Sequence, residues 1–204
     1  MAEHIDRTGL MNNIRYNFDY LAKFLNFTNE DISVLNALAP VLFPCIPSIV
    51  ETIYKKLYSF DITKQYFVLR NDSFENFTET NIETDHAVKS AQTEFRKDML
   101  TMYLKRVLIQ TEWNDAFLQY LSQIGELHGH NTSSPSPSPN VHYIHVNALL
   151  GHLEHLILEI IWKTESLDAN NKRASIRAIN KFFWIQNNFF TMHYGILLSK
   201  KISK

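Results

Sequence analysis

The stretch WNDAFLQYLSQIGELHGH, residues 113–130, has apolar side chains at helical spacing that stop at a histidine followed by a glycine. The apolar members of this face are Trp113, Phe117, Tyr120, Leu121, Ile124 and Leu127. Their period of about 3.6 residues predicts an amphipathic helix, started by Thr111, that packs one face into a core. His128 continues this face, and Gly129 lets the chain leave the helix. His128 is therefore either a cap on the last helical carbonyls or a ligand side chain that points inward.

Three further helix starts are visible on the N-terminal side of this stretch. Thr28 precedes acidic residues, which is typical of a helix N-terminus, and Pro47 is placed to open a second helix. The residues at 59–67 predict an aromatic corner, and the polar residues at 70–85 predict a loop. Asp85 can then cap a long helix. This half of the chain is expected to be helical.

The C-terminal side shows the same helical period. The sequence SSPSPSP at 133–139 predicts a loop between helices, because apolar helical patterns continue on both sides of it. Asn140 can cap a helix to about Lys163, and a last helix rich in aromatic residues is expected at 171–199. No long stretch alternates with period two, and no repeat is visible. The pattern predicts an all-α protein of about seven or eight helices, folded as a single domain over residues 1–204.

Composition excludes several classes of protein. Of the 204 residues 45% are hydrophobic, which indicates a folded chain. The formal net charge of −1 provides no strong positive field, so neither nucleic acid nor an anionic membrane is an expected partner. A single cysteine, Cys45, excludes an intramolecular disulfide. The polar start of the chain is unlike a signal peptide, and we expect a cytoplasmic protein without a membrane span.

Motifs for catalysis by side chains alone are absent from the sequence. It contains no H-E-x-x-H, no G-x-S-x-G and no glycine-rich phosphate loop. His152 and His155 have a spacing that two metal ligands can share, but exposed polar positions on a long helix explain them more simply. The 14 Phe, 9 Tyr and 3 Trp suit either a large core or a pocket for a flat apolar ligand.

The order of these elements resembles the protoglobins and the globin domains of globin-coupled sensors over about residues 15–200. Four segments carry the resemblance: IPSIVETIYKKLYSFD at 46–61, AQTEFRKDML at 91–100, WNDAFLQYLSQIGELHGH at 113–130 and NVHYIHVNALLG at 140–151. The resemblance implies an all-α, globin-like fold, a three-over-three helical sandwich. It also implies an extra N-terminal helical segment, here residues 1–27.

The same resemblance implies a site for haem b, held without covalent attachment. His128 matches the proximal histidine that binds iron, Tyr54 the distal tyrosine and Phe95 the aromatic residue over the haem. The other positions expected to contact the cofactor are Ile53, Tyr58, Ala91, Met99 and Ile124. The chemistry is consistent, because a neutral imidazole binds iron and a phenol can donate a hydrogen bond to a bound diatomic gas. Tyr54 and Phe95 also suit packed core positions without a ligand.

Three positions depart from the family pattern. Ile53 stands where a tryptophan often precedes the distal tyrosine, which should leave more space beside the bound gas. Ala91, one turn before Phe95, excludes a distal histidine there. The loop at 133–139 replaces a stretch that is often basic, so other groups must hold the haem propionates.

The expected function is reversible binding of O₂, CO or NO, as a sensor, carrier or scavenger. An enzyme is less expected, although a haem enzyme such as a nitric oxide dioxygenase or a peroxidase-like protein is one alternative. Its acid–base groups would be few, since Tyr54 is the best candidate. A haem-free signalling module with a globin fold is the other alternative. The family also allows a homodimer through the last two helices.

Overall fold

The computed structural model describes residues 2–68, 82–128 and 141–202, and side chains within 2–64, 93–128 and 141–195. The described residues form ten α-helices and one 3-10 helix, with no strand among them. The helices are α1 (Arg7–Asn12), α2 (Ile14–Leu25), α3 (Asn29–Ala37), α4 (Ala39–Leu42), η1 (Phe43–Cys45), α5 (Ile46–Tyr58), α6 (Asp61–Val68), α7 (Ile82–Ile109), α8 (Asp115–His128), α9 (Tyr143–Lys163) and α10 (Ala169–Ile202). The prediction of an all-α protein is confirmed.

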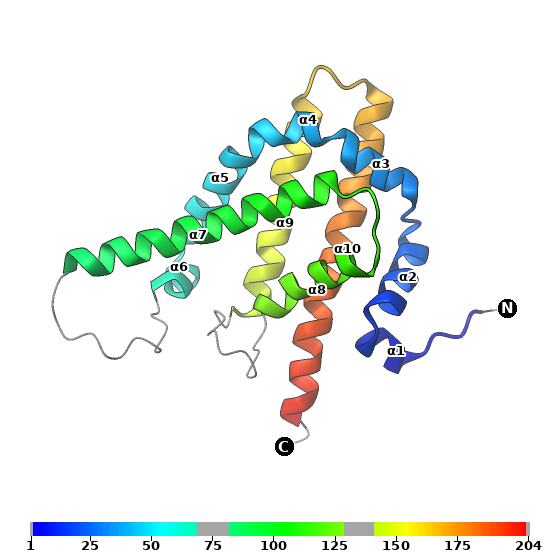
Figure 1. Ribbon diagram of the computed structural model, residues 1–204, viewed down its shortest axis with the longest axis horizontal. Helices are drawn as coiled ribbons and strands as arrows, with labels where there is room; N and C mark the ends of the chain where they lie inside the picture. Colours follow the sequence, from blue (N-terminus) through cyan, green and yellow to red (C-terminus); the bar gives the residue numbers. More distant parts are fainter. Residues whose placement is uncertain (1, 69–81, 129–140, 203–204) are drawn as a thin grey trace.

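Figure 1 shows how the longer helices are arranged. Helices α9 and α10 pack side by side and run in opposite directions, and α7 and α8 lie across this pair. Helices α3, α4 and α5 follow one another along one edge, where α5 packs against both α7 and α9. Helix α2 packs against α8 and α10, and α1 packs against α2. Helix α8, which ends at His128, is therefore enclosed by the beginning and the end of the chain.

The predicted helix start at Thr28 is confirmed. The side chain of Asp31 accepts a hydrogen bond from the backbone N–H of Thr28 at 2.9 Å, which forms half of a capping box. The same carboxylate lies 2.8 Å from Nζ of Lys181 on α10, and both side chains are largely buried. The pair joins the start of α3 to α10 at a place that is largely shielded from water.

Several helix boundaries differ from the sequence predictions. The stretch predicted as an aromatic corner contains α6, and α7 begins at Ile82 rather than at Asp85. Helix α8 begins at Asp115 rather than near Thr111, because Oδ1 of Asn114 accepts the N–H of Phe117 at 3.1 Å and caps the helix there. The residues of the predicted 133–139 loop lie outside the described residues.

The last two helices were predicted closely. Helix α9 ends at Lys163 as expected, but it begins at Tyr143 with His142 as its N-cap, so the predicted cap at Asn140 is wrong; Asn140 itself lies outside the described residues. Helix α10 begins slightly earlier than expected, because Oδ1 of Asp168 accepts the N–H of Asn171 at 2.8 Å. The total exceeds the predicted seven or eight helices because the N-terminal segment forms α1 and α2 and because α6 is a separate short helix.

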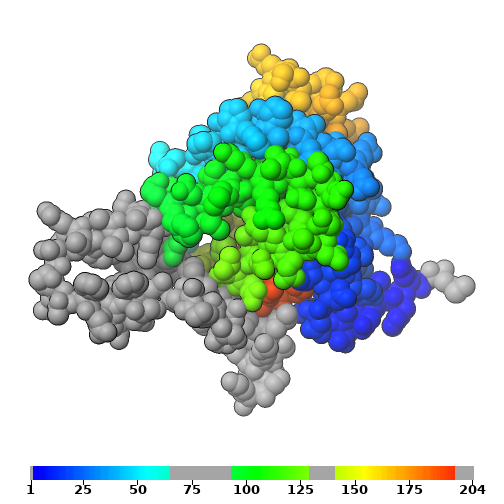
Figure 2. All heavy atoms as spheres, viewed as in Figure 1, coloured from blue at the N-terminus to red at the C-terminus, as the bar shows by residue number. Residues whose placement is uncertain are grey.

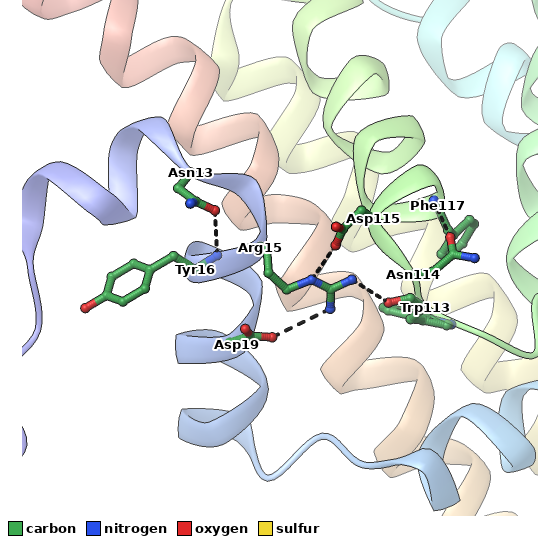
Figure 3. A network of polar contacts seen from close by, with 8 residues as sticks. All are labelled: Asn13, Arg15, Tyr16, Asp19, Trp113, Asn114, Asp115 and Phe117. Carbon is green, nitrogen blue, oxygen red and sulfur yellow. Dashed lines mark hydrogen bonds and ion pairs between the residues drawn. The ribbon is translucent and has the colours of Figure 1, made fainter.

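The N-terminal segment is connected to the start of α8 by Arg15, as Figure 3 shows. Nε of Arg15 lies 2.6 Å from Oδ1 of Asp115, and Nη2 donates to the carbonyl of Trp113 at 3.1 Å. The ring of Trp113 packs against Phe18 and Phe27, with centroid distances of 5.7 and 4.7 Å. One arginine and one aromatic cluster thus hold α2 against the first turn of α8.

Two segments, Asn29–Tyr58 and Tyr143–Lys163, are long and apolar enough to cross a membrane by length and composition. The first is divided into α3, α4, η1 and α5. Both segments place side chains in the core, among them Leu35, Ile53 and Ile161. Core helices of soluble proteins have the same length and composition, so the expected absence of a membrane span stays a prediction.

Candidate functional site

Helices α7 and α8 meet at one end and separate toward the other. Where they meet, the guanidinium of Arg106 lies 3.8 Å from the ring centroid of Tyr120, and Tyr103 packs beside the same ring at 6.5 Å. From this contact α7 extends back toward its N-terminus and α8 extends toward His128 (Figure 1). Figure 2 shows that the surface is hollowed between the two helices. We refer to this hollow as the α7–α8 cleft.

Large apolar side chains lie on the faces of α7 and α8 that continue from the contact between Arg106 and Tyr120. On α7, Phe95, Met99 and Met102 are 63%, 37% and 53% exposed, and they lie on the helix face that continues into Arg106. On α8, the face of Tyr120 continues through the half-buried Ile124 to Leu127, which is 53% exposed. Adjacent large apolar side chains on facing helices are unusual for a solvent-exposed surface and are typical of a binding site.

His128 lies at the open end of the α8 wall and has a defined tautomer. Its Nδ1 is 2.8 Å from the carbonyl oxygen of Ile124, one turn earlier. Because a carbonyl oxygen only accepts, Nδ1 carries the proton and Nε2 keeps its lone pair. No residue that the structure describes forms a hydrogen bond with Nε2. A histidine that only caps the helix needs nothing more than the hydrogen bond from Nδ1. A metal ligand also needs a free lone pair, and Nε2 provides one.

The protonation state of His128 is also the one that a metal ligand requires. Burial lowers the pKa of the imidazole, the charge of Arg96 lowers it further, and the bond to the Ile124 carbonyl opposes both effects. The edge of the ring packs against Phe190 of α10 at a centroid distance of 5.4 Å. At neutral pH His128 is therefore a neutral imidazole in a fixed orientation.

Helix α8 is held against α10 along its length. A Cβ added to Gly125 would lie 3.0 Å from the carbonyl oxygen of Phe189, so the two backbones approach as closely as only glycine allows. Nearby, Oγ of Ser122 is 2.8 Å from Nε2 of His193. The buried side chain of Gln186 donates to the Leu121 carbonyl at 3.1 Å. The α8 wall of the cleft is thus supported from behind by close packing and by polar contacts.

Tyr54 lies at the contact between α5 and α7. It is buried, and burial raises the pKa of its phenol, an effect that the charge of Arg96 partly opposes. The phenol is therefore protonated at physiological pH and can donate a hydrogen bond. Nζ of Lys97 lies 5.9 Å from the Tyr54 ring centroid and forms ion pairs with Glu51 and Glu94 at 2.7 and 2.9 Å.

Arg96 relates the two predicted ligand groups to each other. Its positive charge lowers the pKa of Tyr54 and the pKa of His128, although these residues belong to different helices. The guanidinium of Arg96 on α7 thus acts electrostatically on Tyr54 of α5 and on His128 of α8. Sequence reasoning missed Arg96, because a charged residue beside an apolar stripe is common on exposed helices.

The other predicted contact residues have varied surroundings. Ile53 is fully buried in the core, and Tyr58 bonds through its hydroxyl to Oγ1 of Thr93 at 2.7 Å, which connects α5 to α7. Ala91 lies in α7, but its side chain is outside the described residues. The positions that the sequence did not single out are Met102 as a contact residue, Arg96, Gly125, Phe190 and Tyr194.

Among the described residues, the histidine pair considered as a metal site is not joined by further metal-binding side chains. The rings of His152 and His155 lie parallel at a centroid distance of 6.4 Å. Within the described part of the chain, no group of three or more His, Cys, Asp or Glu side chains could hold a metal ion. The stacked pair therefore does not form a metal site by itself.

Comparisons with known proteins agree with this architecture. A family model described as Protoglobin matches residues 15–196. Among solved structures, the globin domain of a Geobacter sulfurreducens globin-coupled sensor superposes with a TM-score of 0.61 at 16% sequence identity, covering 86% of this chain and 96% of that chain. At that identity the likeness shows the fold alone. A search of curated protein sequences finds no match. The predicted globin-like fold is confirmed.

Proposed function

The chain belongs to the protoglobin family, and we propose that it binds haem b without covalent attachment in the α7–α8 cleft, with Nε2 of His128 as the iron ligand. One observation carries the proposal. The bond from Nδ1 of His128 to the Ile124 carbonyl leaves the Nε2 lone pair available beside an apolar cleft. When bound, haem supplies an iron atom at which O₂, CO or NO binds reversibly.

The cleft residues fit a flat apolar group. Phe95, Met99 and Met102 provide one apolar wall, and Ile124 with Leu127 provides the other. A planar macrocycle placed between two such walls covers apolar surface that is otherwise exposed to water, which favours binding. The thioethers and the phenyl ring also adapt well to an aromatic surface.

His128 supplies the proximal ligand in this proposal. Its lowered pKa keeps the imidazole neutral, so no proton competes for Nε2 near pH 7. The Ile124 carbonyl accepts the proton on Nδ1, which orients the ring and makes it a stronger donor toward a metal.

Tyr54 supplies the distal hydrogen bond. Its raised pKa keeps the phenol protonated, and a bound diatomic gas that gains negative charge accepts from it. The ion pairs of Lys97 beside the ring restrict where the ring can move. The nearby positive charge of Arg96 favours the same polarisation of the gas. These groups suit reversible gas binding, in a sensor, a carrier or a scavenger.

A visible spectrum tests the proposal directly. The purified protein, supplied with haem, should show a Soret band that is lost or shifted in His128→Ala. The matched control is His155→Ala, which removes an exposed histidine of α9 and should leave the band unchanged. A colourless wild type that takes up no added haem would instead favour the haem-free signalling module.

We also propose that the protein forms a homodimer through α9 and α10. Trp162 and Trp184, one on each helix, are 66% and 55% exposed, and large exposed tryptophans are common at the centre of protein interfaces. Sedimentation of wild type and Trp184→Lys tests this proposal. A wild type that sediments as a monomer at micromolar concentration would contradict it.

A further inference from the structure

The geometry points to Tyr194 of α10 as the positioning residue for His128. The hydroxyl of Tyr194 donates to the carbonyl oxygen of His128 at 2.7 Å and shares its single proton with the carbonyl oxygen of Val141, just before α9. One phenol therefore connects the last residue of α8 to the approach to α9. The link to iron rests on the proposed function, whereas the link to the backbone of His128 does not.

The His128 carbonyl has a particular need for this donor. It is among the last carbonyls of α8, which have no N–H partner inside their own helix. A partly buried carbonyl without a hydrogen-bond donor is unfavourable. The hydrogen bond from Tyr194 therefore stabilises the final turn of α8. The same hydrogen bond fixes the position of the His128 backbone relative to α10.

Three contacts then determine the place of the imidazole. Its Nδ1 bonds the Ile124 carbonyl, its edge packs against Phe190, and its backbone carbonyl accepts from Tyr194. Phe190 and Tyr194 are four residues apart, so they lie on the same face of α10. Two of the three restraints on His128 therefore come from one face of one helix.

Tyr194 is itself held in place. Its ring packs against the ring of Tyr143 at a centroid distance of 5.2 Å, a contact that a phenylalanine at position 143 would keep. Because the phenol ring is fixed, its hydroxyl acts on His128 as a rigid donor rather than as a mobile side chain. Movement of α10 at Tyr194 is thereby coupled to movement of the last turn of α8, and the reverse also holds.

Tyr194→Phe tests the inference, because it removes one oxygen and keeps the ring packing. In the haem-free protein, hydrogen exchange at the amides of the last turn of α8 should become about three- to tenfold faster, as expected for the loss of one hydrogen bond. Tyr143→Phe is the matched control. It removes a hydroxyl from the neighbouring ring, which bonds Asn187 and Thr191 rather than His128, and it should leave those amides unchanged.

A second readout follows the effect to the iron. In haem-loaded ferrous protein, Tyr194→Phe should broaden the iron–histidine stretching band and move it to lower frequency, whereas Tyr143→Phe should not. Unchanged exchange in Tyr194→Phe, or equal effects of the two variants, would overturn the inference. If wild type binds no haem, the proposed function fails, but the exchange measurement still decides whether Tyr194 positions the end of α8.

Discussion

The two walls of the α7–α8 cleft are built in different ways. The α8 wall is supported from behind by α10, through the close approach at Gly125 and the polar contacts of Ser122 and Gln186. The α7 wall presents Phe95, Met99 and Met102 forward, with much of their surface exposed. A wall that is anchored can fix a ligand atom such as Nε2 of His128. A wall of exposed, flexible apolar side chains can adapt to the group it covers. We therefore expect substitutions in the α8 wall to change the stability of the fold and substitutions in the α7 wall to change the affinity for the bound group.

The largest expected effect concerns the distal group, which should alter gas binding and leave folding intact. Tyr54→Phe removes a hydrogen bond to a partly charged bound oxygen, which is worth about 1.5–3 kcal/mol and corresponds to about 10- to 100-fold faster O₂ release. Stopped-flow measurement of O₂ dissociation from haem-loaded protein checks this. An unchanged dissociation rate would remove Tyr54 from the site.

Next in size is the anchoring of the α8 wall. Gly125→Ala should lower the free energy of unfolding by about 1–3 kcal/mol, because the new methyl group meets the Phe189 backbone, which cannot easily move. Gly151→Ala on α9 is the matched control. Nothing lies within 4 Å of the added methyl there, and alanine should stabilise the helix by about 0.5–1 kcal/mol. In urea unfolding of the haem-free proteins, the free energy of unfolding should fall in Gly125→Ala and rise in Gly151→Ala. Changes of the same sign in both variants would disprove the close approach of α8 and α10.

A substitution in the α7 wall should weaken haem binding and leave the stability of the fold nearly unchanged. Met102→Ser should change the stability of the haem-free protein by less than about 0.5 kcal/mol, because the side chain is half exposed. In haem-loaded protein the lost apolar contact should speed haem transfer to an acceptor apoglobin about tenfold. If haem loss is unaffected while stability falls, Met102 is a core residue and the comparison of the walls is wrong.

The smallest effect is the pH dependence of the α8–α10 contact. Burial lowers the pKa of His193, while Glu126 and the contact with Ser122 oppose the shift. The unfolded chain then binds a proton more readily than the folded protein does. The stabilising contribution is present above the unfolded pKa of about 6.5 and is lost as pH falls through it toward the lower folded value. Stability between pH 7 and 5 should fall less steeply in His193→Gln than in wild type, and identical slopes would exclude this contribution.

Periodicity in the sequence was sufficient for the long helices and for the end of α8 at His128. It failed where one side chain decides a boundary, as at Asn114, whose cap moved the start of α8 beyond Thr111. It also could not reveal contacts between distant segments. The glycine at 125 looked like an ordinary helix position, and its need to be glycine comes from Phe189, far along the chain. The single domain, the cytoplasmic location and every predicted haem contact stay predictions; the predicted contact residues are His128, Tyr54, Phe95, Ile53, Tyr58, Ala91, Met99 and Ile124.

The two ends of α8 are each held by a residue that is far away in the sequence. Asp115 at its start is bound by Arg15, 100 residues earlier, and His128 at its end is bound by Tyr194, 66 residues later. Contacts of such separation form slowly, because long stretches of chain must first be brought together. During synthesis α8 emerges before the helix that supports it. His128 therefore reaches its final place only after α10 has left the ribosome, and capture of the proposed haem would be among the last steps of maturation.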